Sequence, residues 1–360
     1  MARLGGHAWA ADLDLKCQRA EAVARCAEAM LRKGFAPDVV VGHPGWGELL
    51  AIKDVLPGVP VLHQLEFVYQ LQGADTGFDP EFRSSDWGSA VRLRLRRLPQ
   101  LLAFHDLDHA LAPTHWQAST APRVFRDRIS VIHEGIDTAA IKPRPAAFVE
   151  LKSAGLRFQK GDEVVSFVAR QLEPYRGFHV FMRMLPRLQA LRPNCQVLIV
   201  GGDGVSYGAP PVGAKSWRRV LLQELDGRLD LSRIHFVGKV PHDVLHHLFQ
   251  VTACHVYLTY PFVLSWSLLE AMSCAAVVVG SATPPVQEVI EDQVNGLLVD
   301  FFDHDRLAST VAAVLSDPSS YAQLGVKARE TVKTNYDLNA VCLPRQIELV
   351  ERLAEGLQPL

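Results

Sequence analysis

The chain has 360 residues, 48% of them hydrophobic, and a formal net charge of -2 at pH 7. This length favours two domains over one, and the nearly balanced charge gives no indication of a nucleic-acid-binding protein. The 6 cysteines form no CxxC pair, so we expect a reducing compartment, without disulfides and without a structural zinc site.

Short apolar runs alternate with helical stretches along the chain, which is typical of parallel sheets built from βα units. In the first part we predict one long helix near residues 14–33. Four strands are predicted there, at 38–42, 60–64, 109–113 and 128–132. The segment 141–150 contains two prolines and predicts a linker.

The second part has a more regular pattern. Strands are predicted at 163–169, 195–202, 233–238, 254–260, 276–281 and 295–300. Helices are predicted at 178–191, 215–229, 242–250 and 266–273, and the tail from residue 304 reads as helices. Because these strands are apolar on both faces, they indicate a covered parallel sheet. Ligands of such domains bind where the carboxyl ends of the strands meet helix amino termini.

The stretch YPFVLSWSLLEAM, at 260–272, joins the end of an apolar strand to the start of an apolar helix. Such a helix would direct free N–H groups and the positive end of its dipole at the sheet edge, which suits an anion such as diphosphate. Ser265, Trp266 and Ser267 at its start are therefore candidate ligand contacts. Glu270, about one turn further on, could accept two hydroxyl protons, as from a ribose diol. Alternatively, Glu270 simply lies favourably near a helix start.

Two arginines and a glycine turn lie at the same predicted edge. Arg170 ends the strand at 163–169, and Arg176 follows in the next loop. A guanidinium suits phosphate oxygens and keeps its charge at every working pH, although both arginines could equally be solvated surface residues. Gly202 lies in VLIVGGDG, where glycines allow a tight turn and close backbone approach to a ligand. The turn is not a complete GxGxxG motif.

These segments occur in a specific order. The series FVARQLEPYRGF, VLIVGGDG, FVGKVPHDVL, SLLEAMSC, VVVGSATPPVQEVI and NGLLVDFFD resembles the donor-binding half of the family-4 retaining glycosyltransferases. GFAPDVVVGHPGWGELL, GADTGFDPEF and APTHWQAS resemble the amino-terminal half of one bacterial subgroup. The resemblance implies an α/β protein of the GT-B fold, with two Rossmann-like domains that face a cleft. It also implies a nucleoside-diphosphate-sugar donor and a retained anomeric configuration.

The resemblance assigns roles to individual residues. Arg170 occupies the place of the family's phosphate-binding arginine, and Arg176 replaces the usual lysine. Glu270 matches the second glutamate of the E-x7-E motif, which holds the ribose. Phe262 stands where the first glutamate is expected, and Ser265 stands where the motif has glycine. These departures concern the contact to the sugar more than the contact to the nucleotide.

In the first domain, His43 ends a predicted strand in VVVGHPGWGE, where the family often places a histidine opposite the donor sugar. It could hydrogen-bond a sugar hydroxyl near the reacting carbon, or be held structurally by its neighbours. Glu66 follows the strand at 60–64, and Glu48 is a second nearby carboxylate. Either could act on an acceptor hydroxyl, or be an ordinary surface carboxylate. We take His43 and Glu66 as the candidate catalytic residues.

We predict no metal site and no cofactor besides the donor substrate. Asp12-Leu13-Asp14 and Asp106-Leu107-Asp108 have the form of a metal-binding D-x-D, but neither follows a clear strand. Histidines 242, 246 and 247 lie on one predicted helix, without a carboxylate or cysteine spaced to complete a metal set. An anion site at a helix end needs no metal.

We expect an acceptor-side α/β domain at 1–145 and a nucleotide-sugar-binding domain at 146–338. A carboxyl-terminal helix at 339–360 is expected to cross back to the first domain. Family members begin with an apolar strand, whereas the first strand-like run here is at 38–42. The first domain is therefore expected to be incomplete, as from a truncated or misassigned start.

The resemblance implies a hexosyltransferase that moves a sugar to a glycan or lipid-linked acceptor in polysaccharide biosynthesis. Two alternatives stay open: a nucleotide-binding module of GT-B fold without transferase activity, and a GT-B-fold epimerase acting on the nucleotide sugar. The chain has neither the apolar core of a signal peptide nor an apolar run of the roughly 18 residues that span a bilayer, so we expect a cytoplasmic protein. VRLRLRRLPQLL, at 91–102, could add a peripheral membrane contact, although such a stripe is more often the core-facing side of a surface helix.

Overall fold

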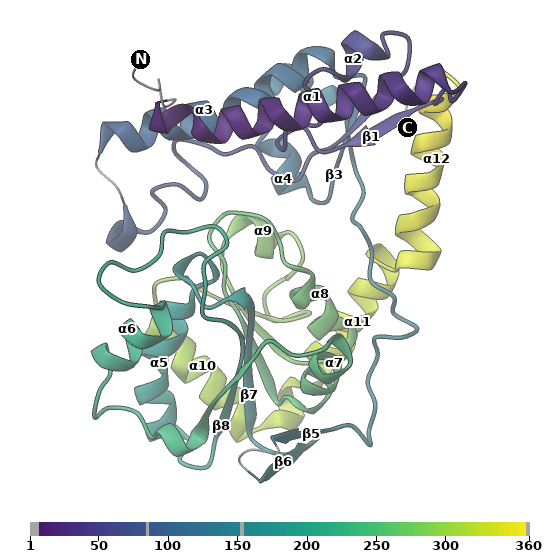
Figure 1. The fold of residues 1–360 in the computed structure, drawn as a ribbon. Coiled ribbons are helices and arrows are strands. Elements are labelled where there is room, and N and C mark those ends of the chain that lie inside the picture. The colour runs from purple at the N-terminus through teal and green to yellow at the C-terminus, as the bar shows by residue number, and fades with distance from the viewer. Residues whose placement is uncertain (1–6, 84–85, 152–154, 358–360) are drawn as a thin grey trace. The chain divides into compact units, whose positions relative to one another are not determined.

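The computed structural model describes residues 7–83, 86–151 and 155–357 (Figure 1). The chain divides into two compact units. Unit 1 consists of the residues up to 134 together with those from 342 onward, and unit 2 consists of residues 135–341. The domain boundaries expected near residues 145 and 338 stay predictions. All 6 cysteines are free.

Unit 1 is built on a four-stranded parallel sheet in the order β1-β2-β3-β4. Each strand lies within a range predicted from the sequence: β1 (Val40–Gly42), β2 (Val61–Gln64), β3 (His109–Ala112) and β4 (Ile129–Val131). β3 is buried along its whole length. β1 forms an edge of the sheet, and the side chain of its Val41 is 45% exposed.

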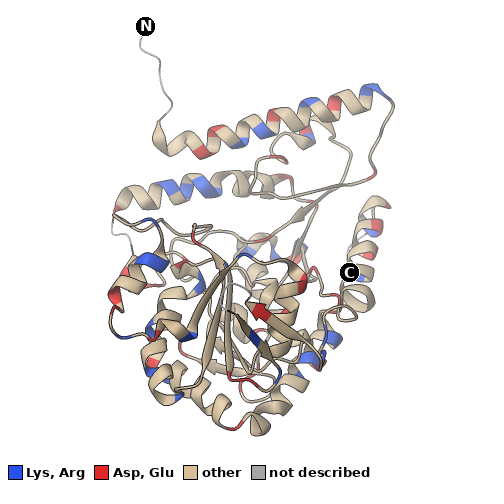
Figure 2. Ribbon diagram, turned by 60° about the horizontal axis from the view of Figure 1, so that its bottom comes forward, with Lys and Arg blue, Asp and Glu red and all other residues tan. Residues whose placement is uncertain are grey.

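Five α-helices accompany this sheet in the described residues: α1 (Ala11–Arg32), α2 (Ile52–Val55), α3 (Trp87–Ala103), α4 (His115–Ser119) and α12 (Leu343–Ala354). α1 has acids in its first turn and a base in its last, which suits the helix dipole. Figure 2 shows charges of both signs interspersed along α1. α3 begins where the carboxylate of Asp86 accepts the N–H groups of Gly88 and Ser89. It continues through Pro99 without ending.

The last helix, α12, belongs to unit 1 although it is remote in sequence from the sheet. The Nε2 atom of Gln346 donates to the carbonyl oxygen of His133 at 2.8 Å. Leu349 and Leu353 of α12 are buried. The helix therefore covers apolar surface beside β4, which a chain ending at unit 2 would leave open to water.

Unit 2 contains a six-stranded parallel sheet in the order β12-β11-β10-β7-β8-β9. Its strands are β7 (Val164–Gln171), β8 (Gln196–Gly202), β9 (Ile234–Gly238), β10 (Cys254–Tyr257), β11 (Val278–Ser281) and β12 (Leu297–Val299). Counted from β7, this is the Rossmann order 3-2-1-4-5-6. The order reverses between β7 and β10, and open α/β sheets bind ligands beyond the carboxyl ends of the strands at such a switch point.

The helices of unit 2 are α5 (Phe178–Leu191), α6 (Trp217–Glu224), α7 (His242–Val251), α8 (Trp266–Ser273), α9 (Pro284–Gln287), α10 (His304–Ser316) and α11 (Pro318–Asn335). α6 is shorter than the helix predicted at 215–229. Its backbone turns at Gly227, where φ is 69°, in the left-handed region that glycine tolerates.

A β-hairpin replaces part of the predicted linker. β5 (Phe148–Leu151) and β6 (Leu156–Gln159) pair antiparallel, so the expectation of a linker throughout 141–150 is wrong. Val149 and Phe158 are buried, and the hairpin packs against α7. Two four-residue strands give too short an alternating pattern to be separated from a loop in the sequence.

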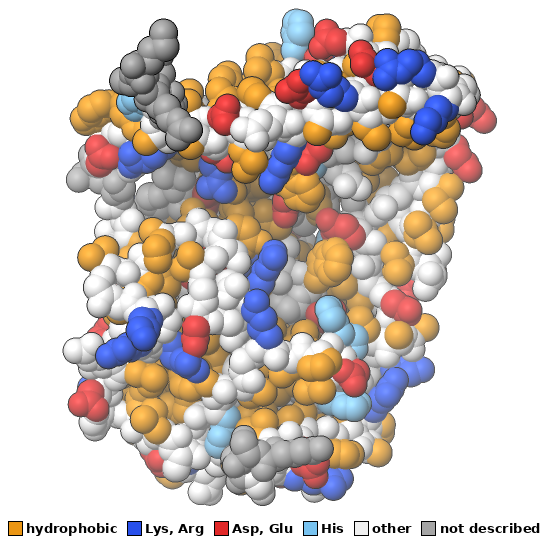
Figure 3. All heavy atoms as spheres, in the orientation of Figure 1, with side chains coloured by type: hydrophobic (Ala, Val, Ile, Leu, Met, Phe, Trp, Pro, Cys, Tyr) orange, Lys and Arg blue, Asp and Glu red, His pale blue; other side chains and the backbone are white. Residues whose placement is uncertain are grey.

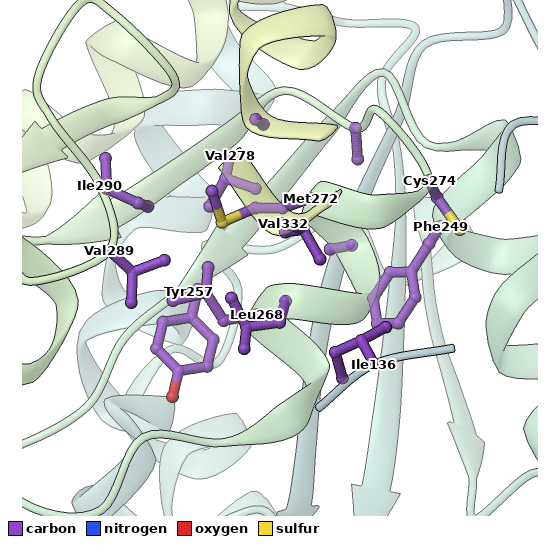
Figure 4. Packing of buried hydrophobic residues seen from close by; sticks show 14 of the residues in the cluster. Ile136, Phe249, Tyr257, Leu268, Met272, Cys274, Val278, Val289, Ile290 and Val332 are labelled. Carbon is purple, nitrogen blue, oxygen red and sulfur yellow. The ribbon is translucent and has the colours of Figure 1, made fainter. Parts of the chain in front are cut away.

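Figure 4 shows most residues of the apolar cluster around α8. Leu268 and Met272 of α8 are fully buried together with Phe249 of α7 and Val278 of β11. Burying a side chain of this size stabilises a fold by about 1.5–3 kcal/mol. Figure 4 shows the ring of Tyr257 beside Leu268, with its hydroxyl oxygen directed out of the cluster. This packing fixes α8, the helix with the predicted donor site, to the sheet.

The charged residues of unit 2 lie mostly on its helices and loops, and its strands are largely free of them (Figure 2). This distribution fits a sheet that is covered on both faces. In the part of the chain that the structure describes, none of the helices combines the length and the apolar character needed to cross a membrane.

Candidate functional site

Arg170 lies at the carboxyl end of β7, next to the last residue of that strand, Gln171. β7 pairs with β8 on one side and with β10 on the other, so this end lies at the switch point of the sheet. The Arg170 side chain is exposed, and no hydrogen bond or ion pair links it to another described residue. Its guanidinium is therefore available to an anionic ligand.

The glycine turn after β8 packs against the protein itself. The Oε1 atom of Gln171 accepts the N–H of Gly204 at 3.1 Å, and the N–H of Leu172 donates to the carbonyl oxygen of Gly202 at 2.8 Å. A Cβ atom at Gly202 would lie 2.4 Å from Gln171 Oε1 and 2.8 Å from Lys239 Cε. A side chain at 202 would therefore require the flexible ends of Gln171 and Lys239 to shift. A ligand contact at Gly202 stays a prediction.

Glu173, which was not among the predicted site residues, organises the loop that follows this turn. Its side chain is 1% exposed. The two carboxylate oxygens accept the backbone N–H groups of Ser206, Tyr207 and Gly208 at 2.9–3.3 Å. Hydrogen bonds to an ionised acceptor are the stronger kind, so this carboxylate joins the loop after β7 to the loop after β8. In the sequence, the signal is an acid between two arginines directly after an apolar strand.

Arg176 holds the loop after β10. Its Nη1 atom donates to the Oγ1 atom of Thr259 at 3.0 Å and to the carbonyl oxygen of Val263 at 2.8 Å. The guanidinium lies 5.4 Å from the centre of the Tyr207 ring and 5.9 Å from that of Phe262, within the range of cation–π attraction. Within the described chain, Nε and Nη2 have no hydrogen-bond partner. Arg176 is thus held in place through Nη1, and its Nε and Nη2 atoms can still donate to a ligand.

Phe262 belongs to an aromatic cluster at this edge. Its ring centre lies 4.8 Å from that of Tyr207 and 5.5 Å from that of Tyr175. Tyr175 also packs on Tyr260 at 4.8 Å, and Tyr260 contacts Phe301 at 5.3 Å. Phe262 is 2% exposed. The position where the resemblance expects a carboxylate thus carries a ring that packs inward on other rings.

The start of α8 leaves backbone donors available. Ser265 precedes the helix but makes no side-chain cap to it, and its Oγ atom lies 3.0 Å from that of Ser267. The N–H of Ser265 donates to the hydroxyl of Tyr257 at 2.8 Å, and burial raises the pKa of that hydroxyl, which keeps it neutral. The N–H groups of Trp266 and Ser267 find no acceptor in the described residues. The first turn of α8 can therefore bind an anion.

Glu270 lies one turn further along α8 and is 6% exposed. Its carboxylate receives no hydrogen bond from a described residue. The imidazole of His246 on α7 lies close by, with its Nε2 atom 3.5 Å from Glu270 Oε1. Buried carboxylates are normally hydrogen-bonded, so a group with this much unused acceptor capacity suits a ligand that brings its own hydroxyl donors.

In unit 1 the structure brings His43 and Glu66 together. The Nε2 atom of His43 lies 3.5 Å from Oε2 of Glu66. The Nδ1 atom of His43 accepts the N–H of Gly45 at 3.0 Å, and the ring stacks on Trp46 at 4.4 Å. Because Nδ1 is occupied as an acceptor, the neutral imidazole carries its proton on Nε2. Nε2 is buried and makes no hydrogen bond in the described chain, so its proton is left for another acceptor.

One acid from each of the two D-x-D sequences is held in an ion pair. Asp12 pairs with Lys16 at 2.8 Å, and Asp108 pairs with Lys53 at 2.6 Å. Glu48 has one buried carboxylate oxygen, Oε2, without a hydrogen-bond partner in the described chain. A cavity of about 590 Å³ lies between α4, β4 and α12, and none of the predicted site residues lines it.

Two parallel α/β units, one of them in Rossmann order with cations and free N–H groups at its switch point, define the GT-B class of protein. The comparison with family models agrees. The chain belongs to the family described as glycosyl transferases group 1, whose model matches residues 149–331. A second model, the glycosyl transferase family 4 group, matches residues 2–141. The resemblance seen in the sequence motifs is thus confirmed for both parts of the chain.

Curated relatives include a D-inositol 3-phosphate glycosyltransferase of Mycolicibacterium vanbaalenii, 29% identical over 83% of this chain and 63% of that protein. A GDP-mannose-dependent alpha-(1-6)-phosphatidylinositol monomannoside mannosyltransferase of Mycolicibacterium smegmatis is 26% identical over 68% of this chain and 62% of its own. The chain thus spans less than two thirds of the length of these two relatives.

Solved structures share the fold. HepE of Anabaena, solved in complex with UDP and glucose, superposes with a TM-score of 0.70 at 19% identity, over 93% of this chain and 83% of its own. Sucrose-phosphate synthase of Thermosynechococcus elongatus gives a TM-score of 0.73 at 18% identity, over 96% of this chain and 80% of its own. At these identities the likeness establishes the GT-B fold alone.

Proposed function

We propose that the protein is a retaining glycosyltransferase that moves a sugar from a nucleoside-diphosphate-sugar to a glycan or lipid-linked acceptor, without using a metal ion. The observation that carries the proposal is the unsatisfied hydrogen-bonding capacity of the Glu270 carboxylate. This carboxylate is buried and without a hydrogen-bond donor in the described chain, one turn inside a helix that begins with free N–H groups. The two hydroxyls of a ribose would supply the missing donors.

The diphosphate would lie against the positive groups of the same edge. Arg170, the Nε and Nη2 donors of Arg176, and the N–H groups of Trp266 and Ser267 all lack partners in the described residues. Each hydrogen bond to a charged group contributes about 1.5–3 kcal/mol. Fixed donors at the leaving diphosphate stabilise the negative charge that develops there as the sugar–phosphate bond breaks, so the departure needs no metal.

In unit 1, we assign His43 a donor role toward a sugar hydroxyl. Its Nε2–H is held in place because Nδ1 accepts from Gly45 and the ring stacks on Trp46. Glu66 is 45% exposed, so its carboxylate is open to solvent and to an acceptor hydroxyl. We propose Glu66 as the group that orients this hydroxyl for attack on the face from which the diphosphate leaves.

The relatives indicate which donors to test first. One is named for its dependence on GDP-mannose, and a structural neighbour was solved with UDP and glucose. UDP- and GDP-sugars are therefore the first donors of choice for this chain. A lipid-linked acceptor would bring the protein to a membrane surface. Three large apolar residues of α3, Trp87, Leu101 and Leu102, are exposed and provide the surface to examine for that contact.

One observation favours a second candidate, a nucleotide-binding module that does not transfer sugar. Phe262 replaces the carboxylate that the resemblance expects near the sugar, and it packs inward on Tyr207 and Tyr175. The chain keeps the residues expected to contact the nucleotide but lacks this carboxylate, which is expected to contact the sugar. Binding of a nucleoside diphosphate without turnover of any nucleotide sugar would support this candidate against the first.

The test compares Glu270→Gln with Glu291→Gln, an exposed carboxylate outside the site. Calorimetry with UDP, GDP and ADP should show binding to the parent protein and to Glu291→Gln. Loss of charge at Glu270 should weaken that binding by about 10- to 100-fold, since it removes charge-assisted hydrogen bonds worth about 1.5–3 kcal/mol. Equal affinity of Glu270→Gln and the parent would overturn the role of Glu270. Assays with UDP-glucose and GDP-mannose then separate transferase from binding module.

A further inference from the structure

Two histidines of α7 and the buried carboxylate of α8 converge in unit 2. His242 and His246 are one helical turn apart, so they lie on the same face of α7. Glu270 reaches the same point from α8. One ligand atom from each of the three side chains lies within 4.8 Å of the other two. The sequence could not show this group, because the carboxylate comes from a different helix beyond an intervening strand.

One distance in this group is close to the separation of two ligand atoms on a metal ion. The Nε2 atom of His246 lies 3.5 Å from Glu270 Oε1, beyond the usual 2.7–3.2 Å of an N–H···O hydrogen bond. Ligand atoms at about 2.0–2.1 Å around a tetrahedral Zn²⁺ are separated from one another by about 3.3–3.4 Å. The three ligand atoms, now within 4.8 Å of one another, would coordinate such an ion once drawn together to this spacing.

The hydrogen bonding of His246 supports the same conclusion. Its Nε2 atom is buried and has no hydrogen-bond partner in the described residues. A buried polar atom without a partner costs free energy and is rare in folded proteins. Cys274 does not supply the partner, because its Sγ atom donates to the carbonyl oxygen of His246 at 4.0 Å instead. A bound cation would satisfy this nitrogen and the Glu270 carboxylate at once.

The site is open to solvent on one side. His242 is exposed, and Figure 3 shows histidine side chains gathered over α7 on this face of the molecule. Three protein ligands leave a fourth position of a tetrahedral ion free for water or a ligand. Imidazole nitrogens with one carboxylate are typical ligands of divalent first-row transition metals, zinc among them.

We propose that His242, His246 and Glu270 form a binding site for a divalent transition metal ion of the zinc class. The site has a regulatory consequence that rests on the proposed function. Glu270 cannot hold a metal ion and both hydroxyls of a ribose at the same time, so metal and nucleotide exclude one another. The ion would act as an inhibitor of donor binding and take no part in sugar transfer.

The metal site is tested on the full-length protein without nucleotide. Zn²⁺ is titrated by calorimetry, and Co²⁺ by its visible absorption, which reports nitrogen and oxygen ligation directly. The variant His242→Ala changes an exposed residue, and His246→Ala removes the second imidazole. The matched control is His247→Ala, the neighbouring histidine of α7 that lies outside the group of three.

We expect the parent and His247→Ala to bind one Zn²⁺ ion with equal affinity. Loss of either His242 or His246 should weaken binding by about 100-fold or more, since removing outer-shell partners alone costs 10- to 100-fold. If all four proteins bind Zn²⁺ alike, or none binds it, the chain holds an adventitious ion only and the proposal is overturned.

Competition is measured separately, so that the two proposals can fail independently. Saturating Zn²⁺ should weaken binding of UDP or GDP to the parent, and should leave it unchanged in His242→Ala. If Zn²⁺ binds at the three residues but nucleotide affinity is unaffected, the metal site stands and the shared use of Glu270 is refuted. If Zn²⁺ does not bind while Glu270→Gln still loses nucleotide, the function stands and the metal site falls.

Discussion

Replacing Arg176 by methionine should cost the protein both stability and nucleotide affinity. The change removes the donor to Thr259 Oγ1, in a residue that is 0% exposed, and the donor to the carbonyl oxygen of Val263. Leaving a buried polar group unsatisfied costs about 1–3 kcal/mol, so two such groups set a range of about 2–6 kcal/mol. Val263 is only half-buried, and we therefore expect about 3 kcal/mol.

The assay is thermal unfolding with and without a nucleoside diphosphate. For a unit of this size, about 3 kcal/mol corresponds to a fall in Tm of roughly 6–12 °C. The matched variant is Arg170→Met, because Arg170 lies at the same sheet edge but is exposed and makes no hydrogen bond within the described chain. Its stability should change by less than about 0.5 kcal/mol, while nucleotide binding weakens about 10-fold through the loss of one charge-assisted contact.

The two variants therefore separate the two roles of a guanidinium. Arg176→Lys should recover part of the lost stability, since an ammonium can donate to both acceptors from one nitrogen, as Nη1 does, but is a more compact and more strongly hydrated group. An Arg176→Met protein with the Tm of the parent would refute the claim that this residue holds the loop after β10. If that variant is destabilised but binds UDP and GDP as tightly as the parent, Arg176 makes no phosphate contact.

Three further outcomes are expected from denaturation in urea. Gly177→Ala should lose more than about 2 kcal/mol, because φ is 67° and the new Cβ would lie 2.3 Å from Leu258 Cβ; an unchanged midpoint would contradict this. Leu268→Ala should lose about 2–5 kcal/mol through the cavity it leaves, whereas Leu231→Ala, at a residue 56% exposed, should lose less than about 0.5 kcal/mol. Burial lowers the pKa of His255 to about 3 from its usual 6.5. Between pH 3 and pH 6.5 the folded state therefore binds fewer protons than the unfolded state. The stabilisation of the folded state that is present above pH 6.5 is lost as the pH falls toward 3, and the free energy of unfolding drops by up to about 1.4 kcal/mol per pH unit. Substitution by glutamine should flatten this part of the profile, and identical slopes for parent and variant would exclude the explanation.

The buried parallel strands could be predicted because they leave a strong signal in the sequence. β7 is apolar on both faces from Val164 to Ala169 apart from Ser166, and the helix predicted at 178–191 has the same bounds as α5. The strand predicted at 254–260 was too long, since β10 ends at Tyr257, where its pairing with β11 stops. Residues 258–260 are still buried. An apolar run in the sequence therefore predicts which residues are buried. It does not predict where a strand ends, because that depends on the neighbouring strand with which it pairs.

The candidate site was predictable where it depends on element order. Arg170 lies at the end of β7 and Glu270 near the start of α8, and the order of the strands brings these two places to one edge of the sheet. The contacts of Glu173 with the N–H groups of Ser206, Tyr207 and Gly208 were not predictable. They join two loops far apart in sequence, and backbone donors carry no residue signature.

The assignment of both chain ends to unit 1 has a consequence for biosynthesis. Residues 135–341 leave the ribosome before α12 is made, so unit 2 has its complete chain first. At about 5–20 residues per second, those roughly 200 residues take about 10–40 s to synthesise. During this interval the four-stranded sheet of unit 1 lacks α12, and the apolar surface that Leu349 and Leu353 later cover is exposed to water. Chaperones that bind newly made chains would therefore find exposed apolar surface in unit 1, and not in unit 2.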